Sequence, residues 1–287
     1  MAAGSVAAAD PLPVFVSILP QKYMVEQIGK DRVAVKVMVS PGASPATYEP
    51  KPVQMAKLAK TKIYFPIGVA FERAWLEKIA KTNPAMTIVH TDEGIDKIPM
   101  AEHGHGEEDH LHDKAHSHED NFHQEDGLDP HIWLSPKRVM VQAGHILKGL
   151  VQADPGSKKI YTQNYTEFLK QTADLDQALS SLLLENKGMG FMVFHPAWGY
   201  FAHDYGLKMI PIEIEGKDPK PGQLKDLIQA ARKKGIQIIF VQPQFSAKSA
   251  TLVAREIQGQ VVAADPLAYD WHQNMKNMAE KFKEALK

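Results

Sequence analysis

The sequence predicts an α/β fold in which two βαβ-type lobes with mostly parallel sheets are joined by one long backbone helix. The chain has 287 residues, a length that suits two domains of ordinary size. Strand-like apolar runs alternate with short helical segments in both halves, as expected of βαβ units. Between the halves, a helical pattern of about 30 residues would span about 40 Å, which is more than one small domain needs.

The first half alternates four predicted strands with three predicted helices. Its opening run, 14–19, is almost continuously apolar, which is typical of a strand buried on both faces of a parallel sheet. A Pro/Gly/Ser turn at 40–45 follows the second strand. The predicted strands are 14–19, 33–38, 62–67 and 86–89, and the predicted helices are 21–28, 52–59 and 71–81.

Two helices then lead from the first half to the second. One begins at Pro136, where proline suits a first turn, and ends near Gln152. The next runs from about 157 to 185 with a stripe of side chains spaced alternately four and three residues apart, which predicts one buried face. We interpret it as the helix that joins two domains, with a long surface helix of a single domain as the alternative. The stripe is Tyr161, Tyr165, Phe168, Thr172, Leu175, Leu179 and Leu182.

The second half repeats the pattern of the first. Its predicted strands are 190–194, 209–213, 236–241 and 261–264, and its predicted helices are 197–205, 221–234, 247–258 and 275–287. We therefore divide the chain into four parts. Ligands of such folds bind between lobes and beyond the carboxyl ends of strands. The parts are a cloning remnant or disordered terminus (1–10), an N-terminal lobe (11–155), a linking helix (156–186) and a C-terminal lobe (187–287).

Composition excludes several classes of protein. With no cysteine, the chain has no disulfide, thiolate zinc site or cysteine nucleophile. The formal net charge of -1 gives no support for binding nucleic acid, which requires a basic surface. No apolar run approaches the roughly 20 residues of a membrane span. Residues 1–10 lack the basic and long apolar regions of a signal peptide, so we do not interpret them as an intact one.

A histidine-rich segment interrupts the chain between the two halves of the pattern. Residues 102–126 are almost entirely His, Asp, Glu, Gly and Ser, and no period in them would bury a face, so we predict a mobile loop. Neutral imidazoles and carboxylates bind transition metals, which favours a low-affinity metal collector over a pH-sensitive linker or a chance charge run. The candidate auxiliary ligands are His103, His105, His110, His112, His116, His118 and His123.

Three further residues could form one metal site at the ends of predicted strands. His131 follows the histidine-rich segment, His195 follows the strand 190–194, and Asp265 follows the strand 261–264. Two imidazoles and a carboxylate from different elements make a reasonable zinc set. Each residue also has an ordinary interpretation, because a single histidine is more often a satisfied polar residue and Asp265 before Pro266 also suits a turn or a helix cap. The sequence has no metalloprotease, nucleophile-elbow or phosphate-loop motif, so we do not expect an enzyme.

Five segments together carry a family resemblance. They are Ser40-Pro-Gly-Ala-Ser-Pro-Ala-Thr-Tyr-Glu-Pro50, Asp129-Pro-His-Ile-Trp-Leu134, Phe194-His-Pro-Ala-Trp-Gly-Tyr-Phe-Ala202, Glu213-Ile-Glu-Gly-Lys217 and Asp265-Pro-Leu267. In order and spacing the chain resembles, from about Val14 to its C-terminus, the cluster A-I (cluster 9) metal-binding proteins of ABC importers, in their ZnuA-like zinc branch. The histidine-rich segment is typical of the same branch. The resemblance implies two α/β lobes bridged by a long rigid helix, with the metal held between them.

The resemblance also implies which residues bind the metal. His131 and His195 match ligands, and a histidine at 195 favours zinc because manganese members usually carry glutamate there. Asp265 matches a position that supplies a carboxylate ligand in some members and stands near the site in others. The chain departs from the family at Ala46, where the first ligand is normally histidine. Natural divergence with a replacement ligand elsewhere is one explanation, and engineered removal of the ligand is the one that we favour.

The expected function is that of a monomeric periplasmic protein that captures a zinc ion with high affinity and delivers it to the membrane permease of an ABC importer. Without a ligand at Ala46, zinc should bind more weakly, with water in the fourth place. A zinc-dependent hydrolase is the first alternative, because three ligands plus water is also the arrangement of a catalytic zinc site. A metal-dependent adhesin or metal-buffering protein is the second.

Overall fold

The N-terminal lobe is built on a four-stranded parallel sheet. The computed structural model describes residues 10–101, 127–214 and 217–286. The sheet order is β2-β1-β3-β4. Strand β2 therefore lies on one side of β1, and β3 and β4 lie on the other side. Val14 on β1 pairs with Val35 on β2 and with Ile63 on β3. The strands are β1 (Leu12–Val16), β2 (Val33–Val37), β3 (Ile63–Phe65) and β4 (Thr87–Ile88).

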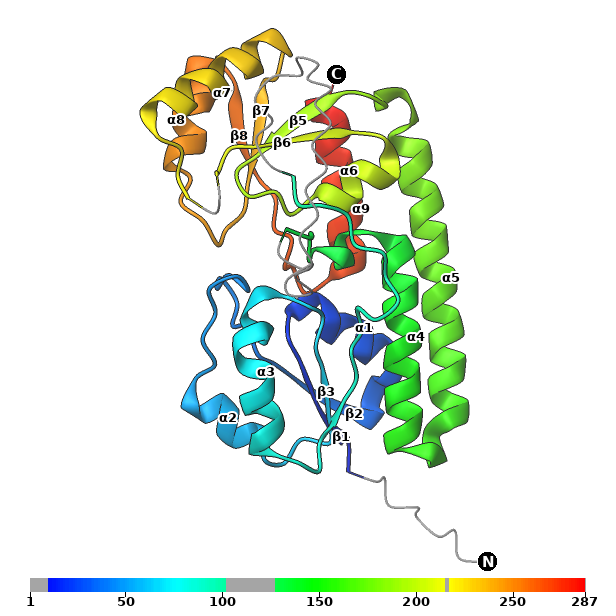
Figure 1. Cartoon of the computed structure of the whole chain (residues 1–287). Coiled ribbons are helices and arrows are strands. Elements are labelled where there is room, and N and C mark those ends of the chain that lie inside the picture. Colours follow the sequence, from blue (N-terminus) through cyan, green and yellow to red (C-terminus); the bar gives the residue numbers. More distant parts are fainter. Residues whose placement is uncertain (1–9, 102–126, 215–216, 287) are drawn as a thin grey trace, which may run out of the picture.

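Helices cover both faces of this sheet (Figure 1). Proline opens two of them, where its missing N–H is harmless: Pro52 in α2 and Pro136 in α4. Ser135 caps α4 by accepting a hydrogen bond from the Arg138 N–H. The predicted strand 14–19 is too long, because α1 already begins at Leu19. The elements are α1 (Leu19–Gly29), η1 (Lys30–Arg32), α2 (Pro52–Leu58), α3 (Ala70–Thr82), η2 (Ile132–Leu134) and α4 (Pro136–Ala153).

The long helix α5 (Lys158–Leu182) runs beside both lobes, as Figure 1 shows. The short turns η3 (Pro155–Ser157) and η4 (Leu184–Asn186) flank it. It packs against α1 and α4 on the N-terminal side and against α9 near its other end. The predicted stripe is the buried face, although Tyr165 and Leu182 at its edge are only half-buried. A single helix therefore packs against both lobes and connects them.

The C-terminal lobe carries a second four-stranded parallel sheet, with the order β6-β5-β7-β8. Its register pairs Met192 on β5 with Ile210 on β6 and with Ile239 on β7. The last helix begins at Trp271 and not at 275 as predicted, because Asp270 caps it by accepting a hydrogen bond from the Gln273 N–H. The elements are β5 (Gly190–Val193), α6 (Gly199–Tyr205), β6 (Lys208–Pro211), α7 (Pro221–Lys233), β7 (Ile238–Val241), α8 (Lys248–Glu256), β8 (Gln260–Ala263) and α9 (Trp271–Ala285).

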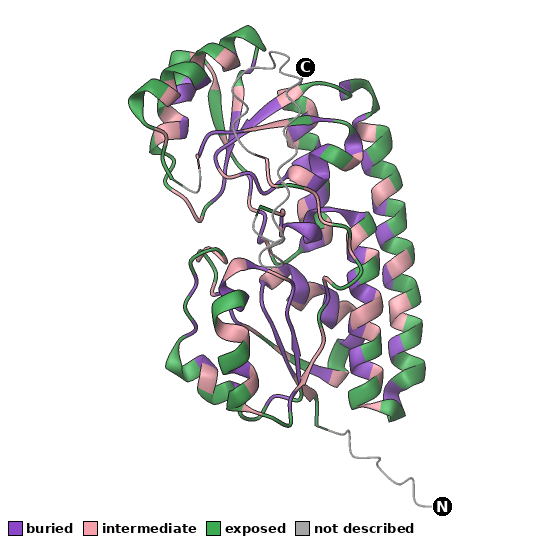
Figure 2. Cartoon of the chain, in the orientation of Figure 1, coloured by how far each residue is buried: buried purple, intermediate pink, exposed green. Residues whose placement is uncertain are grey.

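One apolar core extends through both lobes, and a smaller one lies under α7 and α8 (Figure 2). At the junction of the lobes, the Trp133 indole N–H donates to the carbonyl of Pro266 at 2.7 Å. The Trp271 indole N–H donates in turn to the carbonyl of Trp133 at 2.6 Å. Both indole rings are fully buried, so these bonds join η2 to the C-terminal lobe in a dry environment.

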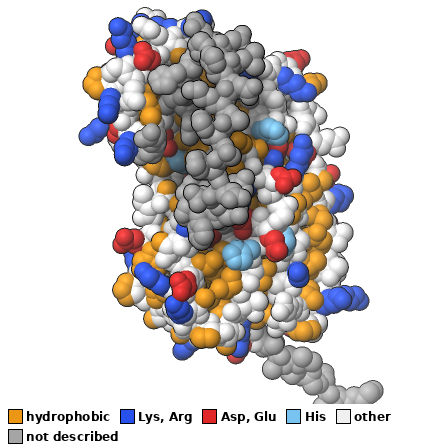
Figure 3. Space-filling model, in the orientation of Figure 1, with side chains coloured by type: hydrophobic (Ala, Val, Ile, Leu, Met, Phe, Trp, Pro, Cys, Tyr) orange, Lys and Arg blue, Asp and Glu red, His pale blue; other side chains and the backbone are white. Residues whose placement is uncertain are grey.

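The surface of the described residues carries charges of both signs. On the face drawn in Figure 3, lysine and arginine side chains are interspersed with aspartate and glutamate over both lobes. This agrees with the near-neutral composition. None of the helices in the described ranges combines the length and the apolar content that crossing a membrane requires.

Candidate metal site

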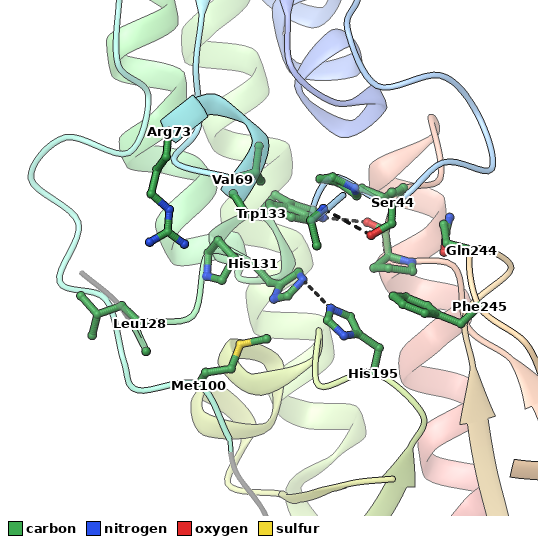
Figure 4. A pocket seen from close by; sticks show the side chains of 17 residues that line it. Ser44, Val69, Arg73, Met100, Leu128, His131, Trp133, His195, Gln244 and Phe245 are labelled. Atoms are coloured by element: carbon green, nitrogen blue, oxygen red, sulfur yellow. Dashed lines mark hydrogen bonds between the residues drawn. The ribbon is translucent and has the colours of Figure 1, made fainter. Parts of the chain in front are cut away.

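A cavity of about 210 Å³ lies between the lobes. Its N-terminal wall comes from the loops that follow β2 and β3 and from the start of α3, including Ala46, Val69 and Arg73. Its C-terminal wall comes from the loops that follow β5, β7 and β8, including His195 and Phe245. Figure 4 shows these side chains converging from the two lobes. The carboxyl ends of strands in both sheets therefore face one shared cavity, where α/β proteins bind ligands.

His131 enters this cavity from a turn organised by Asp129. The carboxylate oxygen Oδ1 of Asp129 accepts the backbone N–H of His131 at 2.9 Å and lies 2.7 Å from its ring nitrogen Nδ1. Because a carboxylate only accepts hydrogen bonds, this contact places a proton on Nδ1 and leaves the Nε2 lone pair free to bind a metal. Asp129 is completely buried and His131 is 8% exposed. His131 precedes η2, so the prediction that it stands at the end of a strand was wrong.

His195 follows β5 with one residue, Phe194, between them, close to the predicted strand end, and is held on two sides. Its Nδ1 lies 2.6 Å from Oε1 of Glu213, which again leaves Nε2 for a metal. Gln242, fully buried after β7, donates to the His195 carbonyl at 2.6 Å and accepts the His195 N–H at 3.2 Å. Burial lowers the pKa of the His195 imidazole, partly opposed by the hydrogen bond to Glu213. His195 is therefore kept neutral, the form that ligates metals.

The two imidazoles point toward each other across the cavity (Figure 4). Their Nε2 atoms lie 3.3 Å apart. In a tetrahedral zinc site with Zn–N bonds of about 2.0–2.1 Å, two nitrogen ligands are about 3.4 Å apart. The rings are also held by aromatic neighbours, since Phe245 stacks on His195 at 4.8 Å between ring centroids and Trp133 lies 5.1 Å from His131. The separation of the two Nε2 atoms is therefore compatible with two ligands of one zinc ion.

Asp265 does not join the two histidines in this structure. Its Oδ1 accepts the Leu267 N–H at 2.9 Å and the side-chain amide of Gln244 at 2.9 Å, and it lines a neighbouring cavity of about 110 Å³. The turn-forming interpretation of Asp265 accounts for these contacts. Within the described ranges, no group of three or more His, Cys, Asp or Glu side chains is placed to hold a metal ion. The assignment of Asp265 as a ligand stays a prediction.

Ala46 lines the same cavity as His131 and His195. The residues that flank the histidine-rich segment on either side also reach the cavity. Met100 and Leu128 line it, and the Met100 N–H donates to the Gly127 carbonyl at 2.7 Å. The seven predicted auxiliary histidines, 103 to 123, lie outside the described residues.

Several residues that build the site were missed in the sequence. Asp129 could have been found, because an aspartate two residues before His131 can accept its backbone N–H. Glu213 and Gln242 gave no such signal, since their contacts with His195 depend on the order of strands in the second sheet. Trp198 and Phe201, which follow His195 in one of the resembling segments, are fully buried and pack edge to face at 5.7 Å between ring centroids, so they are part of the core.

The chain is similar in sequence to known proteins. The sequence model of the family described as "Zinc-uptake complex component A periplasmic" (ZnuA) matches residues 14–285. Among curated relatives, the high-affinity zinc uptake system protein ZnuA of Bacillus subtilis is 28% identical over 252 residues, covering 86% of this chain and 76% of that protein. The zinc-binding lipoprotein AdcA of Streptococcus pneumoniae is 26% identical over 265 residues; the match covers 91% of this chain but only 51% of the relative.

A solved structure agrees more closely. The crystal structure of a ZnuA protein superposes with a TM-score of 0.86 and is 39% identical, covering 97% of this chain and 100% of that one. The two-lobe α/β fold with its long linking helix, predicted from the alternation of elements, is thereby confirmed.

Proposed function

Because the chain belongs to the ZnuA family of periplasmic zinc-uptake components, we propose that it captures a zinc ion and delivers it to the permease of an ABC importer. The observation that carries this proposal is the separation of 3.3 Å between the Nε2 atoms of His131 and His195. That separation suits two ligands of one tetrahedral zinc ion. The buried carboxylates of Asp129 and Glu213 supply the charge behind the rings that strengthens metal binding.

We assign His131 and His195 as zinc ligands from the two sides of the cleft between the lobes. A metal bound by both would cross-link the loop before η2 with the end of β5. Asp265 remains a candidate third ligand, which would first have to leave Gln244 and the Leu267 N–H. Because Ala46 offers no donor atom, restoring a histidine at that position should tighten zinc binding.

The histidine-rich segment is proposed as an auxiliary zinc collector. Its attachment points are part of the cavity wall, since Met100 and Leu128 both line it. Imidazoles tethered there would raise the local concentration of zinc near His131 and His195. Deletion of 102–126 with measurement of zinc transfer rates tests this role, and unchanged rates would argue against it.

The ligand assignment is tested by titrating zinc into this chain and into His131→Ala and His195→Ala. Each substitution removes a direct ligand, so each should weaken binding at the cleft by more than the roughly 10–100-fold typical of losing an outer-shell partner. His203→Ala is the matched control, because the His203 side chain is 61% exposed on α6 and lies outside the cavity. Equal losses in all three variants would mean that zinc binds to histidines in general and not to this pair.

The finer parts of the proposal are a periplasmic location, a monomeric state and delivery without chemical turnover. Sedimentation with and without zinc tests the monomer. Stimulation of the permease's ATPase activity by the zinc-loaded chain in proteoliposomes tests delivery. Hydrolysis of ester or phosphate substrates by the zinc-loaded chain would favour the hydrolase alternative.

A further inference from the structure

Tyr200, on α6, contacts the turn that carries His131 but does not line the cavity between the lobes. Its side chain is completely buried. Its hydroxyl donates to the backbone carbonyl of Asp129 at 2.7 Å and accepts the backbone N–H of Ile98 at 3.2 Å. The hydroxyl therefore uses both its proton and a lone pair, which offsets the cost of burying a polar group.

The two backbone groups that Tyr200 binds belong to short segments that pair with each other. The Asp129 N–H donates to the Ile98 carbonyl at 2.8 Å, and Pro99 and Leu128 form an isolated antiparallel bridge. In the sequence, these segments stand on either side of the histidine-rich segment 102–126. A single hydroxyl of the C-terminal lobe thus binds both of them.

The ring of Tyr200 is itself held in place. The Arg138 guanidinium lies over it, 4.4 Å from the ring centroid, and pairs with the Asp204 carboxylate at 2.9 Å. Burial raises the pKa of the Tyr200 hydroxyl, an effect that the nearby charge of Asp129 reinforces and the hydrogen bond from Ile98 reduces. The hydroxyl therefore stays protonated and keeps donating to the Asp129 carbonyl.

Asp129 connects Tyr200 to the metal site. Its carbonyl is bound by Tyr200, while its carboxylate accepts the backbone N–H of His131 and lies 2.7 Å from Nδ1 of that ring. A shift of the Asp129 backbone would move this carboxylate, which fixes the tautomer and the direction of the ring. The ring of His195 is oriented separately, by Glu213.

From these contacts we infer that Tyr200 is a positioning residue for metal binding, because its hydroxyl fixes Asp129 and Asp129 in turn holds the Nε2 atom of His131 in place. The inference rests on the proposed zinc site and adds the residue that prepares one of its two ligands. Tyr200 does not touch the metal. It acts before zinc binds, by limiting the orientations of a ligand and so reducing the entropy that binding costs.

Tyr200→Phe tests the inference, because it removes the hydroxyl and keeps the ring beneath Arg138. Tyr205→Phe is the matched control, since Tyr205 is also buried on α6 and loses one hydroxyl bond, to Asp176 at 2.9 Å. Zinc affinity at the cleft should fall about tenfold in Tyr200→Phe, the lower end of what losing an outer-shell partner costs, and stay unchanged in Tyr205→Phe. Thermal unfolding checks that both variants fold. Equal affinity in Tyr200→Phe and the parent chain overturns the inference.

Two further backgrounds separate an effect on His131 from an effect on the whole cleft. In His195→Ala, the loss caused by Tyr200→Phe should persist, because His131 is still present to be positioned. In His131→Ala, the same substitution should change the residual zinc affinity by about twofold or less, because residues that act through one another are not additive. A loss that persists in His131→Ala means that Tyr200 acts on the cleft in general, and it overturns the inference.

The ring of His131 in the zinc-free chain gives a readout that needs no metal. Proton–nitrogen correlation spectra of the imidazoles, assigned with His131→Ala, report which ring nitrogen carries the proton. The parent and Tyr205→Phe should show His131 protonated at Nδ1, and Tyr200→Phe should show a mixture of tautomers. Identical His131 signals in Tyr200→Phe and the parent overturn the inference. If these signals change as expected but the parent binds no zinc at the cleft, the proposed function fails and the positioning of His131 by Tyr200 stands.

Discussion

The Nε2 atoms of His131 and His195 lie 3.3 Å apart although 64 residues separate the two histidines in the chain. One ring is oriented by Asp129 and the other by Glu213, through contacts of 2.7 and 2.6 Å to their Nδ1 atoms. All four residues lie outside the histidine-rich segment of the sequence, 102–126, that first suggested a metal. The geometry of the site thus comes from the buried carboxylates and from the packing of the two lobes.

Removing the charge of either buried carboxylate should weaken zinc binding. In Glu213→Gln and Asp129→Asn the ring loses an anionic acceptor, so its Nε2 becomes a poorer donor to the metal. We expect a loss of about 10–100-fold in zinc affinity for each variant, measured by competition with a chromophoric chelator. Asp174→Asn, on the exposed face of α5, is the control. An unchanged affinity in Glu213→Gln and Asp129→Asn would mean that these carboxylates do not tune the ligands.

Gly199 is expected to be required for the position of Asp129. A Cβ atom added at Gly199 would lie 2.5 Å from Oδ2 of Asp129, a contact that forces one of the two groups to move. Gly199→Ala should therefore destabilise the fold and weaken zinc binding together. Gly222→Ala is the matched control, since a Cβ there meets nothing within 4 Å and alanine favours a helix. Zinc titration combined with thermal unfolding checks both effects, and a Gly199→Ala protein with parental affinity would contradict this role for Gly199.

Glu72 should make the stability of the fold depend on pH. Its buried carboxylate accepts hydrogen bonds from the Ser17 hydroxyl and the Gly68 N–H. Burial raises its pKa from 4.5 to about 7, an effect that these hydrogen bonds reduce and the nearby charge of Asp92 reinforces. Between about pH 4.5 and 7, the folded state therefore keeps a proton on Glu72 that the unfolded chain releases. The protonated carboxyl contributes about 3 kcal/mol to the free energy of unfolding below about pH 4.5. This contribution is lost as pH rises through about 7.

Urea unfolding at pH 4.5 and pH 8 measures this dependence. Glu72→Gln has no proton to lose, so its free energy of unfolding should fall less between the two pH values than that of the parent chain. Glu77→Gln, on the same helix with a side chain 80% exposed, should behave like the parent. Identical pH dependence in parent and Glu72→Gln would show that Glu72 ionises normally in the folded state.

The order of elements was predictable from the sequence, because apolar runs and helical stripes are local patterns. The buried face of α5 follows from residues spaced three and four apart, such as Phe168, Thr172 and Leu175. Element ends were less predictable. Helix α1 begins at Leu19, inside an apolar run that also suits a strand, and the Asp270 cap of α9 was overlooked.

Part of the site was also predictable, because it depends on local patterns in the sequence. His195 lies two residues beyond the end of β5, so its position after a strand was visible in the pattern. The contact between His195 and Glu213 was not, because it depends on the pairing of β5 with β6. The engagement of Asp265 by Gln244 likewise depends on residues that follow two neighbouring strands, β7 and β8. Long-range contacts of this kind are set by tertiary structure and leave no local signal.

Restoring a donor at Ala46 should strengthen zinc binding at the cleft. In Ala46→His, an imidazole would project from the N-terminal wall into the cavity that contains His131 and His195. We expect zinc affinity to rise by at least about tenfold, because a direct ligand contributes no less than an outer-shell partner. Calorimetric titration of parent and variant measures the change. Equal affinities would contradict the placement of a ligand position at residue 46.

The central claim is that one zinc ion is held between His131 and His195, and anomalous scattering at the zinc edge from crystals of the zinc-loaded chain tests it most directly. The account predicts a peak between the lobes at about 2.0–2.1 Å from the Nε2 atoms of both histidines. A zinc peak elsewhere, with none between these two nitrogens, would contradict it.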